Sequence, residues 1–163
     1  MSDWAATLFV DASHCPETGA GGYGYRVASS RGKRNGSGIL QGRITNSCVA
    51  EMKAVVNALW LIRNEAIIGP GDTVLVQTDS LYAIDALSGR RYLTSEEVHV
   101  RKEYSKVCNL MYVQLRHIRG HVNSDKPRFR AHARADELAR EQMKLQRKNF
   151  ERGSHAGFGF RDT

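Results

Sequence analysis

The sequence predicts an α/β fold with a five-stranded mixed sheet, in which three antiparallel strands are followed by two parallel strands and helices flank the sheet. Two observations predict this class. Glycine-rich turns separate three strand-like segments before residue 45, as in an antiparallel meander. Beyond residue 45, helix-like and strand-like segments alternate, as in parallel strands joined by right-handed crossover helices.

The first three strands follow from apolar segments and the turns between them. Residues 7–10 are apolar and partly β-branched, and they predict a buried strand that delivers Asp11 at its end. Glycines then lead into a second strand over residues 23–28. The segment 31–36 contains two glycines and predicts a hairpin loop, after which residues 38–44 return as the third strand.

The central part predicts a long helix, a strand and a short helix. Asn46 and Ser47 are favourable helix caps, and apolar residues recur at helical spacing from there to the breaker at residues 69–71. Residues 73–78 predict the fourth strand, and residues 81–87 predict a short helix after it.

The C-terminal part predicts two more helices and the last strand. Residues 95–111 predict a polar helix, and residues 112–118 predict the fifth strand. Residues 120–134 are polar and basic and contain a proline, so we expect a long loop there. Asp136 then opens the last helix, which we expect to end near residue 149.

Length and composition indicate one soluble domain. The chain has 163 residues, of which 41% are hydrophobic, so we predict one domain over residues 1–150 and a flexible tail over residues 151–163. No segment approaches the ~20 apolar residues of a membrane span, and no signal peptide is evident, so we expect a cytoplasmic monomer without membrane contact. Three scattered cysteines favour neither a disulfide framework nor a zinc site.

Charge is distributed unevenly along the chain. Residues 1–100 carry 9 Lys or Arg and 10 Asp or Glu, whereas residues 101–163 carry 15 and 7. Clustered cations release counterions when they bind phosphates, so this asymmetry is typical of a nucleic-acid partner. A basic face that only contacts solvent is the alternative explanation.

Four acidic residues occupy positions from which they can converge. Asp11 and Asp79 each follow an apolar strand, and ligands of such sheets gather at the carboxyl ends of strands. Glu51 lies on an otherwise apolar helix face, where an unpaired acid is costly. Asp11, Asp79 and Asp136 also each fit an ordinary role as a turn, cap or first-turn residue. If the four meet, their oxygens suit magnesium or manganese.

Several segments, in order over residues 7 to about 145, together resemble type 1 ribonuclease H. They are residues 11–13 (Asp-Ala-Ser), 21–24 (Gly-Gly-Tyr-Gly), 45–47 (Thr-Asn-Ser) with Glu51, 78–80 (Thr-Asp-Ser), 118–121 (Ile-Arg-Gly-His) and 135–140 (Ala-Asp-Glu-Leu-Ala-Arg). Each segment alone is a weak signal, but each falls in the strand, helix or loop that this family requires.

The resemblance implies a ribonuclease H-like fold and an endonuclease that cuts the RNA strand of RNA/DNA hybrids, as in primer or R-loop removal. The products would carry 5′-phosphate and 3′-hydroxyl ends. It also implies two Mg²⁺ ions per active site with substrate, with Mn²⁺ as a substitute. By this resemblance Asp11 contacts both ions and Glu51 and Asp79 each help to hold one. Asp136 completes the side that activates water.

The resemblance implies substrate contacts near these acids. Backbone groups around the first aspartate and the glutamate recognise ribose in the family, which indicates Ala12 and Ser13 here. Asn46 and Ser47 are candidates for contacts to the nucleic-acid backbone, and their alternative role is helix capping.

The segment before Asp136 is expected to supply a catalytic histidine and basic residues that bind the substrate. His121 matches the family's mobile loop histidine, which assists proton transfer or product departure, and His132 is the alternative. Lys126, Arg128 and Arg130 flank an aromatic residue, as phosphate-tracking and stacking surfaces often do. A solvated surface loop is the competing interpretation.

Two other functions stay open at this point. The first is a different nuclease on the same architecture, such as a junction resolvase or an exonuclease, because a fold does not determine its substrate. The second is a noncatalytic module that binds hybrids. A binding module gains nothing from holding four mutually repelling carboxylates together, so the sequence favours an enzyme.

Overall fold

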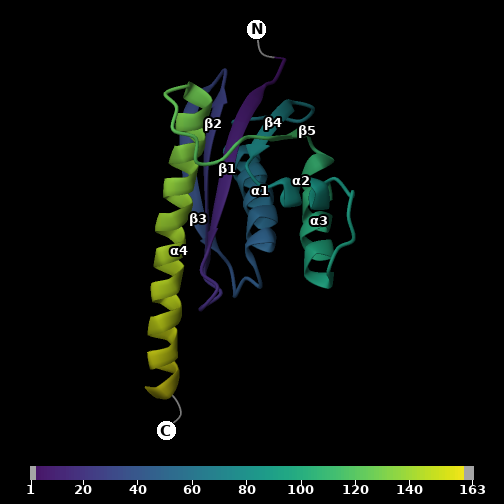
Figure 1. The fold of residues 1–163 in the computed structure, drawn as a ribbon. Helices are drawn as coiled ribbons and strands as arrows, with labels where there is room; N and C mark the ends of the chain where they lie inside the picture. Colours follow the sequence, from purple (N-terminus) through teal and green to yellow (C-terminus); the bar gives the residue numbers. More distant parts are fainter. Residues whose placement is uncertain (1–2, 160–163) are drawn as a thin grey trace.

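A five-stranded mixed sheet forms the centre of the molecule. The computed structural model describes residues 3–159, with side chains described through Gly153. The strands are β1 (Ala6–His14), β2 (Gly21–Ser29), β3 (Gly32–Leu40), β4 (Thr73–Thr78) and β5 (Tyr112–His117). Their order across the sheet is β3-β2-β1-β4-β5, in which the first three are antiparallel and β4 and β5 run parallel to β1 (Figure 1). The predicted fold class is confirmed.

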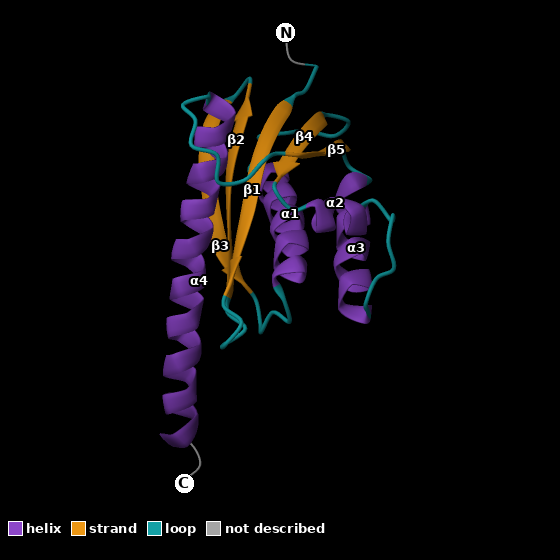
Figure 2. Cartoon of the chain, viewed as in Figure 1, coloured by secondary structure: helices purple, strands orange, loops and turns teal. Residues whose placement is uncertain are grey.

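Helices cover both faces of this sheet (Figure 2). They are α1 (Ser47–Asn64), α2 (Leu81–Leu87), α3 (Ser95–Cys108) and α4 (Pro127–Gly159). Alternate residues of β1 point to opposite faces, so Leu8 and Val10 join the main core with α1, whereas Phe9 packs on Ala131 of α4. No helix within residues 3–159 has the length and apolar composition of a membrane span.

Glycines in β2 allow α4 to lie directly against the sheet. A Cβ atom at Gly22 would run into the Met143 backbone nitrogen, and one at Gly24 would run into the Ala135 carbonyl oxygen. The helix backbone therefore approaches the strand more closely than any side chain would allow. This contact fixes the position of α4 relative to β1.

Strand β3 corrects two predictions. The predicted hairpin loop at residues 31–36 and the predicted strand at 38–44 are both displaced, because β3 already begins at Gly32 and ends at Leu40. Its glycines pair with tyrosines of β2, and Cβ atoms at Gly36 and Gly38 would collide with the rings of Tyr25 and Tyr23. These glycines therefore make room for aromatic rings inside the sheet and do not mark a turn.

Helix α4 corrects the expected loop at residues 120–134 and the helix start at Asp136. The helix begins at Pro127, where a proline loses no intrahelical hydrogen bond, and its first turns are held by Ala131 against Phe9. It also continues past the expected end near residue 149, through Gly159. The domain boundary at residue 150 stays a prediction, and residues 160–163 lie outside the described part.

Candidate active site

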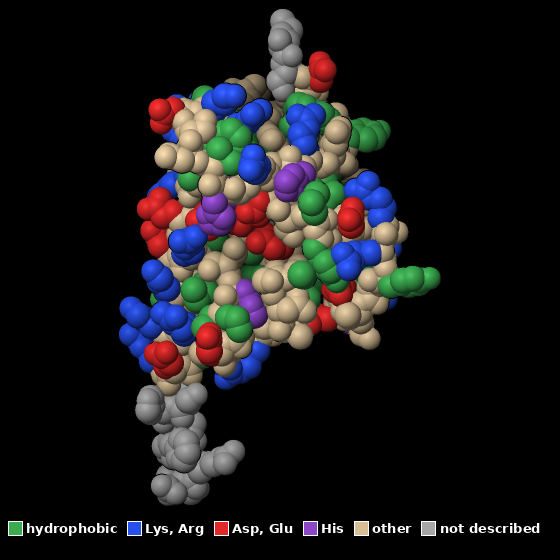
Figure 3. All heavy atoms as spheres, viewed as in Figure 1, with side chains coloured by type: hydrophobic (Ala, Val, Ile, Leu, Met, Phe, Trp, Pro, Cys, Tyr) green, Lys and Arg blue, Asp and Glu red, His purple; other side chains and the backbone are tan. Residues whose placement is uncertain are grey.

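Neighbouring strands bring two of the predicted acids together. The parallel pairing of β1 and β4 ends at Phe9 opposite Gln77. Asp11 and Asp79 each lie two residues beyond that pair, so they emerge at the same edge of the sheet. Asp11 is only 4% exposed, and the Asp79 side chain is 21% exposed. Figure 3 shows acidic side chains gathered in a hollow near the middle of one face.

The α1 helix delivers Glu51 to the same place. Glu51 is flanked by Ala50 and Ala54, both fully buried, so its helix face packs against the sheet. The Glu51 atom Oε2 is inaccessible and has no hydrogen-bond partner among the described residues. A buried carboxylate oxygen without a partner is costly, which indicates that this group is arranged to bind something absent from the protein chain itself.

A histidine completes the group of atoms suited to a metal. Among the described residues, one ligand atom each from Asp11, Asp79 and His132 lie within 4.8 Å of one another. His132 is 4% exposed, and its Nε2 atom lies 3.8 Å from Oδ2 of Asp79. That nitrogen is also buried without a hydrogen-bond partner.

The acids raise one another's pKa. Burial, followed by the charge of Asp79 and the nearby carboxyl of Asp136, raises the pKa of Asp11 from 3.8 to about 8. Burial, followed by the charges of Asp11 and Asp79, raises the pKa of Glu51 well above its ordinary value. These groups resist ionisation unless a positive charge joins them. The donor set and the two unpartnered atoms therefore fit a divalent cation.

Asp136 approaches the same group from α4, and its carboxyl lies near enough to Asp11 to raise the pKa of that residue. It is held on α4 by Arg140, whose guanidinium nitrogen lies 3.1 Å from the Asp136 Oδ2 atom. Its side chain is 23% exposed, and its charge still acts on Asp11 and His132. The structure thus gathers Asp11, Glu51, Asp79 and Asp136 in one place.

The loop histidine expected from the sequence lies at the rim of the site. His121 is exposed, has a φ of 52°, and lines a small cavity of about 60 Å³ together with His132 and Asp136. The preceding Gly120 packs so closely on Asp79 that a Cβ atom there would strike the carboxylate. His132, the alternative, is the histidine placed among the acids.

The sequence favours His121 over His132 only when the last helix is expected to start at Asp136. Once α4 begins at Pro127, His132 and Asp136 are four residues apart on one helix and share a face. That spacing was the signal available in the sequence. It also explains how both residues reach the same small cavity as His121.

The predicted substrate contacts surround the acids, but their roles stay predictions. The Ala12 backbone N–H donates to Asp11 Oδ1 at 3.0 Å, and the neighbouring Ser13 is half-buried. Asn46 accepts a hydrogen bond from the Val49 backbone nitrogen, so its capping role is confirmed. Both Asn46 and the adjacent Ser47 are exposed and free to contact a ligand.

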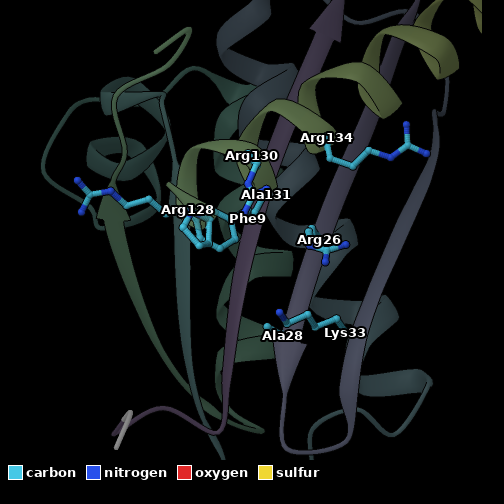
Figure 4. A pocket seen from close by; sticks show the side chains of 9 residues that line it. Phe9, Arg26, Ala28, Lys33, Arg128, Arg130, Ala131 and Arg134 are labelled. Atoms are coloured by element: carbon cyan, nitrogen blue, oxygen red, sulfur yellow. The ribbon is translucent and has the colours of Figure 1, made fainter. Parts of the chain in front are cut away.

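A basic groove lies between the first turns of α4 and the strands β1, β2 and β3 (Figure 4). It has a volume of about 480 Å³, and Phe9 of β1 and Ala131 of α4 are among the apolar residues that line it. Its cations come from the sheet and from the helix: Arg26, Lys33, Arg128, Arg130 and Arg134. The predicted contacts Arg128 and Arg130 therefore line this groove, and the exposed Lys126 immediately precedes α4.

Comparison with known proteins identifies the family. A family model described as RNase H matches residues 3–144. The chain belongs to the RNase H family. The RNase H match covers both the sheet and the converging acids, so this chain is an RNase H-like nuclease. A search among curated proteins found no significant match.

Solved structures of the RNase H family share the fold. RNase H1 from Halobacterium salinarum superposes with a TM-score of 0.67 at 18% identity, over 85% of this chain and 97% of that one. The N-terminal RNase H domain of rv2228c from Mycobacterium tuberculosis gives 0.70 at 16% identity, over 90% and 98%. LC11-RNase H1 in complex with RNA/DNA hybrid gives 0.68 at 17% identity, over 86% and 97%. The predicted ribonuclease H-like fold is confirmed.

Proposed function

We propose that this RNase H-family protein is an endonuclease that hydrolyses the RNA strand of RNA/DNA hybrids, leaving 5′-phosphate and 3′-hydroxyl ends. The observation that carries the proposal is the convergence of Asp11, Glu51 and Asp79 at one edge of the sheet. The similar LC11-RNase H1 was solved in complex with an RNA/DNA hybrid, which supports this choice of substrate. Removal of replication primers or of R-loops is the proposed role.

The acids would hold two divalent cations, Mg²⁺ or Mn²⁺, when substrate is bound. Asp11 would contact both, with Glu51 and Asp79 each helping to hold one and Asp136 completing the water side. Bound cations supply positive charge that activates the attacking water and stabilises the departing oxygen. Burial and neighbouring carboxylates raise the pKa of Asp11 and of Glu51, which supports this assignment because a bound cation would offset both effects.

The protein's own groups orient the substrate and move protons. His121 is exposed at the rim of the site, where an imidazole can transfer a proton to the departing oxygen or assist product departure. Gly120 allows this loop to lie directly on Asp79. Its contact keeps the exposed histidine next to the acids.

Further contacts would hold the two strands of the hybrid. The proposed contacts are Ala12, Ser13, Asn46, Ser47, Lys126, Arg128 and Arg130. Those near Asp11 would recognise 2′-hydroxyl groups of the RNA strand, since only ribose carries them. Arg128 and Arg130 line a groove whose described lining contains no acidic side chain, which suits phosphates.

A substrate panel tests this function. Wild-type protein with Mg²⁺ or Mn²⁺ would be incubated with an RNA/DNA hybrid, duplex DNA, duplex RNA and a four-way junction. We expect cleavage of the RNA strand of the hybrid alone, with 3′-hydroxyl product ends. Cleavage of the junction or of duplex DNA would favour another nuclease activity. Tight hybrid binding without any cleavage would indicate a noncatalytic module.

A further inference from the structure

We propose that His132 is a direct metal ligand and makes the site select transition-metal ions such as Mn²⁺ over Mg²⁺. This inference rests on the proposed function, because it concerns the same metal site. It rests on one observation: the buried Nε2 atom of His132 lies in the cluster with Asp11 and Asp79 and has no hydrogen-bond partner among the described residues.

The distances around His132 fit a coordinating nitrogen better than a hydrogen bond. Its Nε2 atom lies 3.8 Å from Asp79 Oδ2, which is too long for a hydrogen bond. Two ligands on opposite sides of one ion, each ~2.1 Å away, lie about 4.2 Å apart. The ligand atoms of Asp11, Asp79 and His132 lie within 4.8 Å of one another, so rotation of these side chains toward one ion can bring all three into its coordination sphere.

The backbone position of His132 also favours coordination. The residue lies on α4 between Ala131, which packs on Phe9, and the exposed Ala133. A ligand on a packed helix is held in place more firmly than one on an exposed loop.

An imidazole ligand changes which cation the site prefers. Mg²⁺ takes oxygen ligands in near-ideal octahedral geometry and keeps several waters. Imidazole nitrogen instead suits transition metals such as Zn²⁺, Fe²⁺ and Ni²⁺, and Mn²⁺ stands at the weak end of the same series. A site of carboxylates alone has less of this bias, so the addition of the His132 nitrogen to the carboxylate oxygens should favour a transition metal over Mg²⁺.

Pulsed EPR of Mn²⁺ bound to the full chain tests this ligand directly. We expect a ¹⁴N coupling from imidazole in wild-type protein and its loss in His132→Gln, which keeps a polar side chain but removes the ring. The matched control is His121→Asn, because Asn tolerates the positive φ at this position. This control should keep the coupling.

Binding titrations supply a second measurement. His132→Gln should weaken Mn²⁺ binding at least about tenfold, the lower end of the loss seen even for outer partners of metal ligands. Mg²⁺ binding should change less than Mn²⁺ binding. Circular dichroism and thermal unfolding would verify that the variant is folded, and His132→Asn provides a smaller replacement if the glutamine variant is not.

The outcomes separate this inference from the proposed function. If Mn²⁺ binds in a manner that Asp79→Asn abolishes, but without ¹⁴N coupling, the ligand role of His132 is overturned and the nuclease function stands. Equal loss of Mn²⁺ and Mg²⁺ affinity in His132→Gln would also overturn the selectivity. If no divalent cation binds at the acids, the inference and the proposed mechanism both fail.

Discussion

At the scale of single residues, the proposed chemistry depends on buried acids whose ionised form is unfavourable in the folded chain by itself. Asp11 is 4% exposed and adjoins other carboxyl groups, and its pKa rises to about 8. The cost of ionising Asp11 belongs to the folded state only, because the unfolded chain exposes the same group to water. The free energy of unfolding should therefore depend on pH through this residue.

Asp11→Asn should stabilise the metal-free protein at alkaline pH. Between pH 3.8 and about 8 the folded wild type keeps a proton that the unfolded chain releases, so its stability falls as pH rises through this window. The asparagine cannot ionise, and near pH 8 the variant should be more stable by on the order of 1 kcal/mol or more, since one pKa unit is ~1.4 kcal/mol. Urea unfolding in EDTA measures this difference.

The pH profile provides the control for this prediction. The stability difference between Asp11→Asn and wild type should shrink toward pH 4, where both chains carry a neutral group in the fold. Saturating Mn²⁺ should stabilise the wild type more than the variant. Parallel pH profiles for the two proteins would contradict the assigned pKa.

The acids at the ends of β1 and β4 could be predicted from the sequence, because the apolar runs that precede them show where the strands end. Apolar runs located the ends of β1 and β4, and the topology of an α/β sheet placed Asp11 beside Asp79. Glu51 stood out because its neighbours are small and apolar. The pairing of Asp136 with Arg140 has the i,i+4 spacing of a helical ion pair, so the expected helix from Asp136 already contained its signal.

At the scale of elements, the position of α4 determines whether the site forms. This helix carries His132 and Asp136, and it lies against β2 where Gly22 and Gly24 remove all side-chain bulk. A displacement of the helix away from the sheet would move both residues relative to Asp11. Packing far from the acids therefore controls their geometry.

Gly24→Ala should destabilise the protein by about 1–3 kcal/mol, the usual cost of overpacking a filled interior. Its new methyl group would meet the Ala135 carbonyl and the Leu138 Cβ atom, so α4 must shift. Urea unfolding measures the loss. The control is Gly153→Ala on the same helix, where a Cβ meets no described atom within 4 Å and helix propensity favours alanine by up to about 1 kcal/mol. Equal effects at both positions would contradict the close contact.

The elements that sequence reasoning misplaced share a cause. Glycines in β3 were interpreted as turn residues, whereas they accommodate Tyr23 and Tyr25 across the strand pair. The first turns of α4 were interpreted as a loop because they are basic and follow a proline. In both cases tertiary contacts decided the local structure, and single-residue propensities do not contain them.

At the scale of the whole molecule, part of the excess positive charge lines one groove. The first turns of α4 contribute Arg128, Arg130 and Arg134 to the groove, and β2 and β3 contribute Arg26 and Lys33. Arg134 is partly neutralised by Glu137 at 2.7 Å. Part of the positive charge of the C-terminal segment thus lines this groove, and its contact with nucleic acid stays a prediction.

Replacing Arg128 and Arg130 with alanine should weaken hybrid binding and reduce its salt dependence. The slope of log K against log salt should fall by roughly 0.9 for each lost phosphate contact. Fluorescence anisotropy at several salt concentrations measures this slope. The control is Lys144→Ala with Lys148→Ala, which removes two exposed charges farther along α4. A wild-type slope in the Arg128 and Arg130 variant, or an equal loss in the control, would argue against the groove.

Cleavage of an end-labelled RNA/DNA hybrid by wild type and by Asp79→Asn, with Mn²⁺ or Mg²⁺ and with EDTA, tests the convergence of the acids most directly. We predict that wild type cuts the RNA strand only with the cation. The variant, still folded and still able to bind hybrid, should be slower by at least about 100-fold, the upper end of the loss seen for outer partners of metal ligands. Cleavage by Asp79→Asn at the wild-type rate, or full wild-type cleavage in EDTA, would contradict the account.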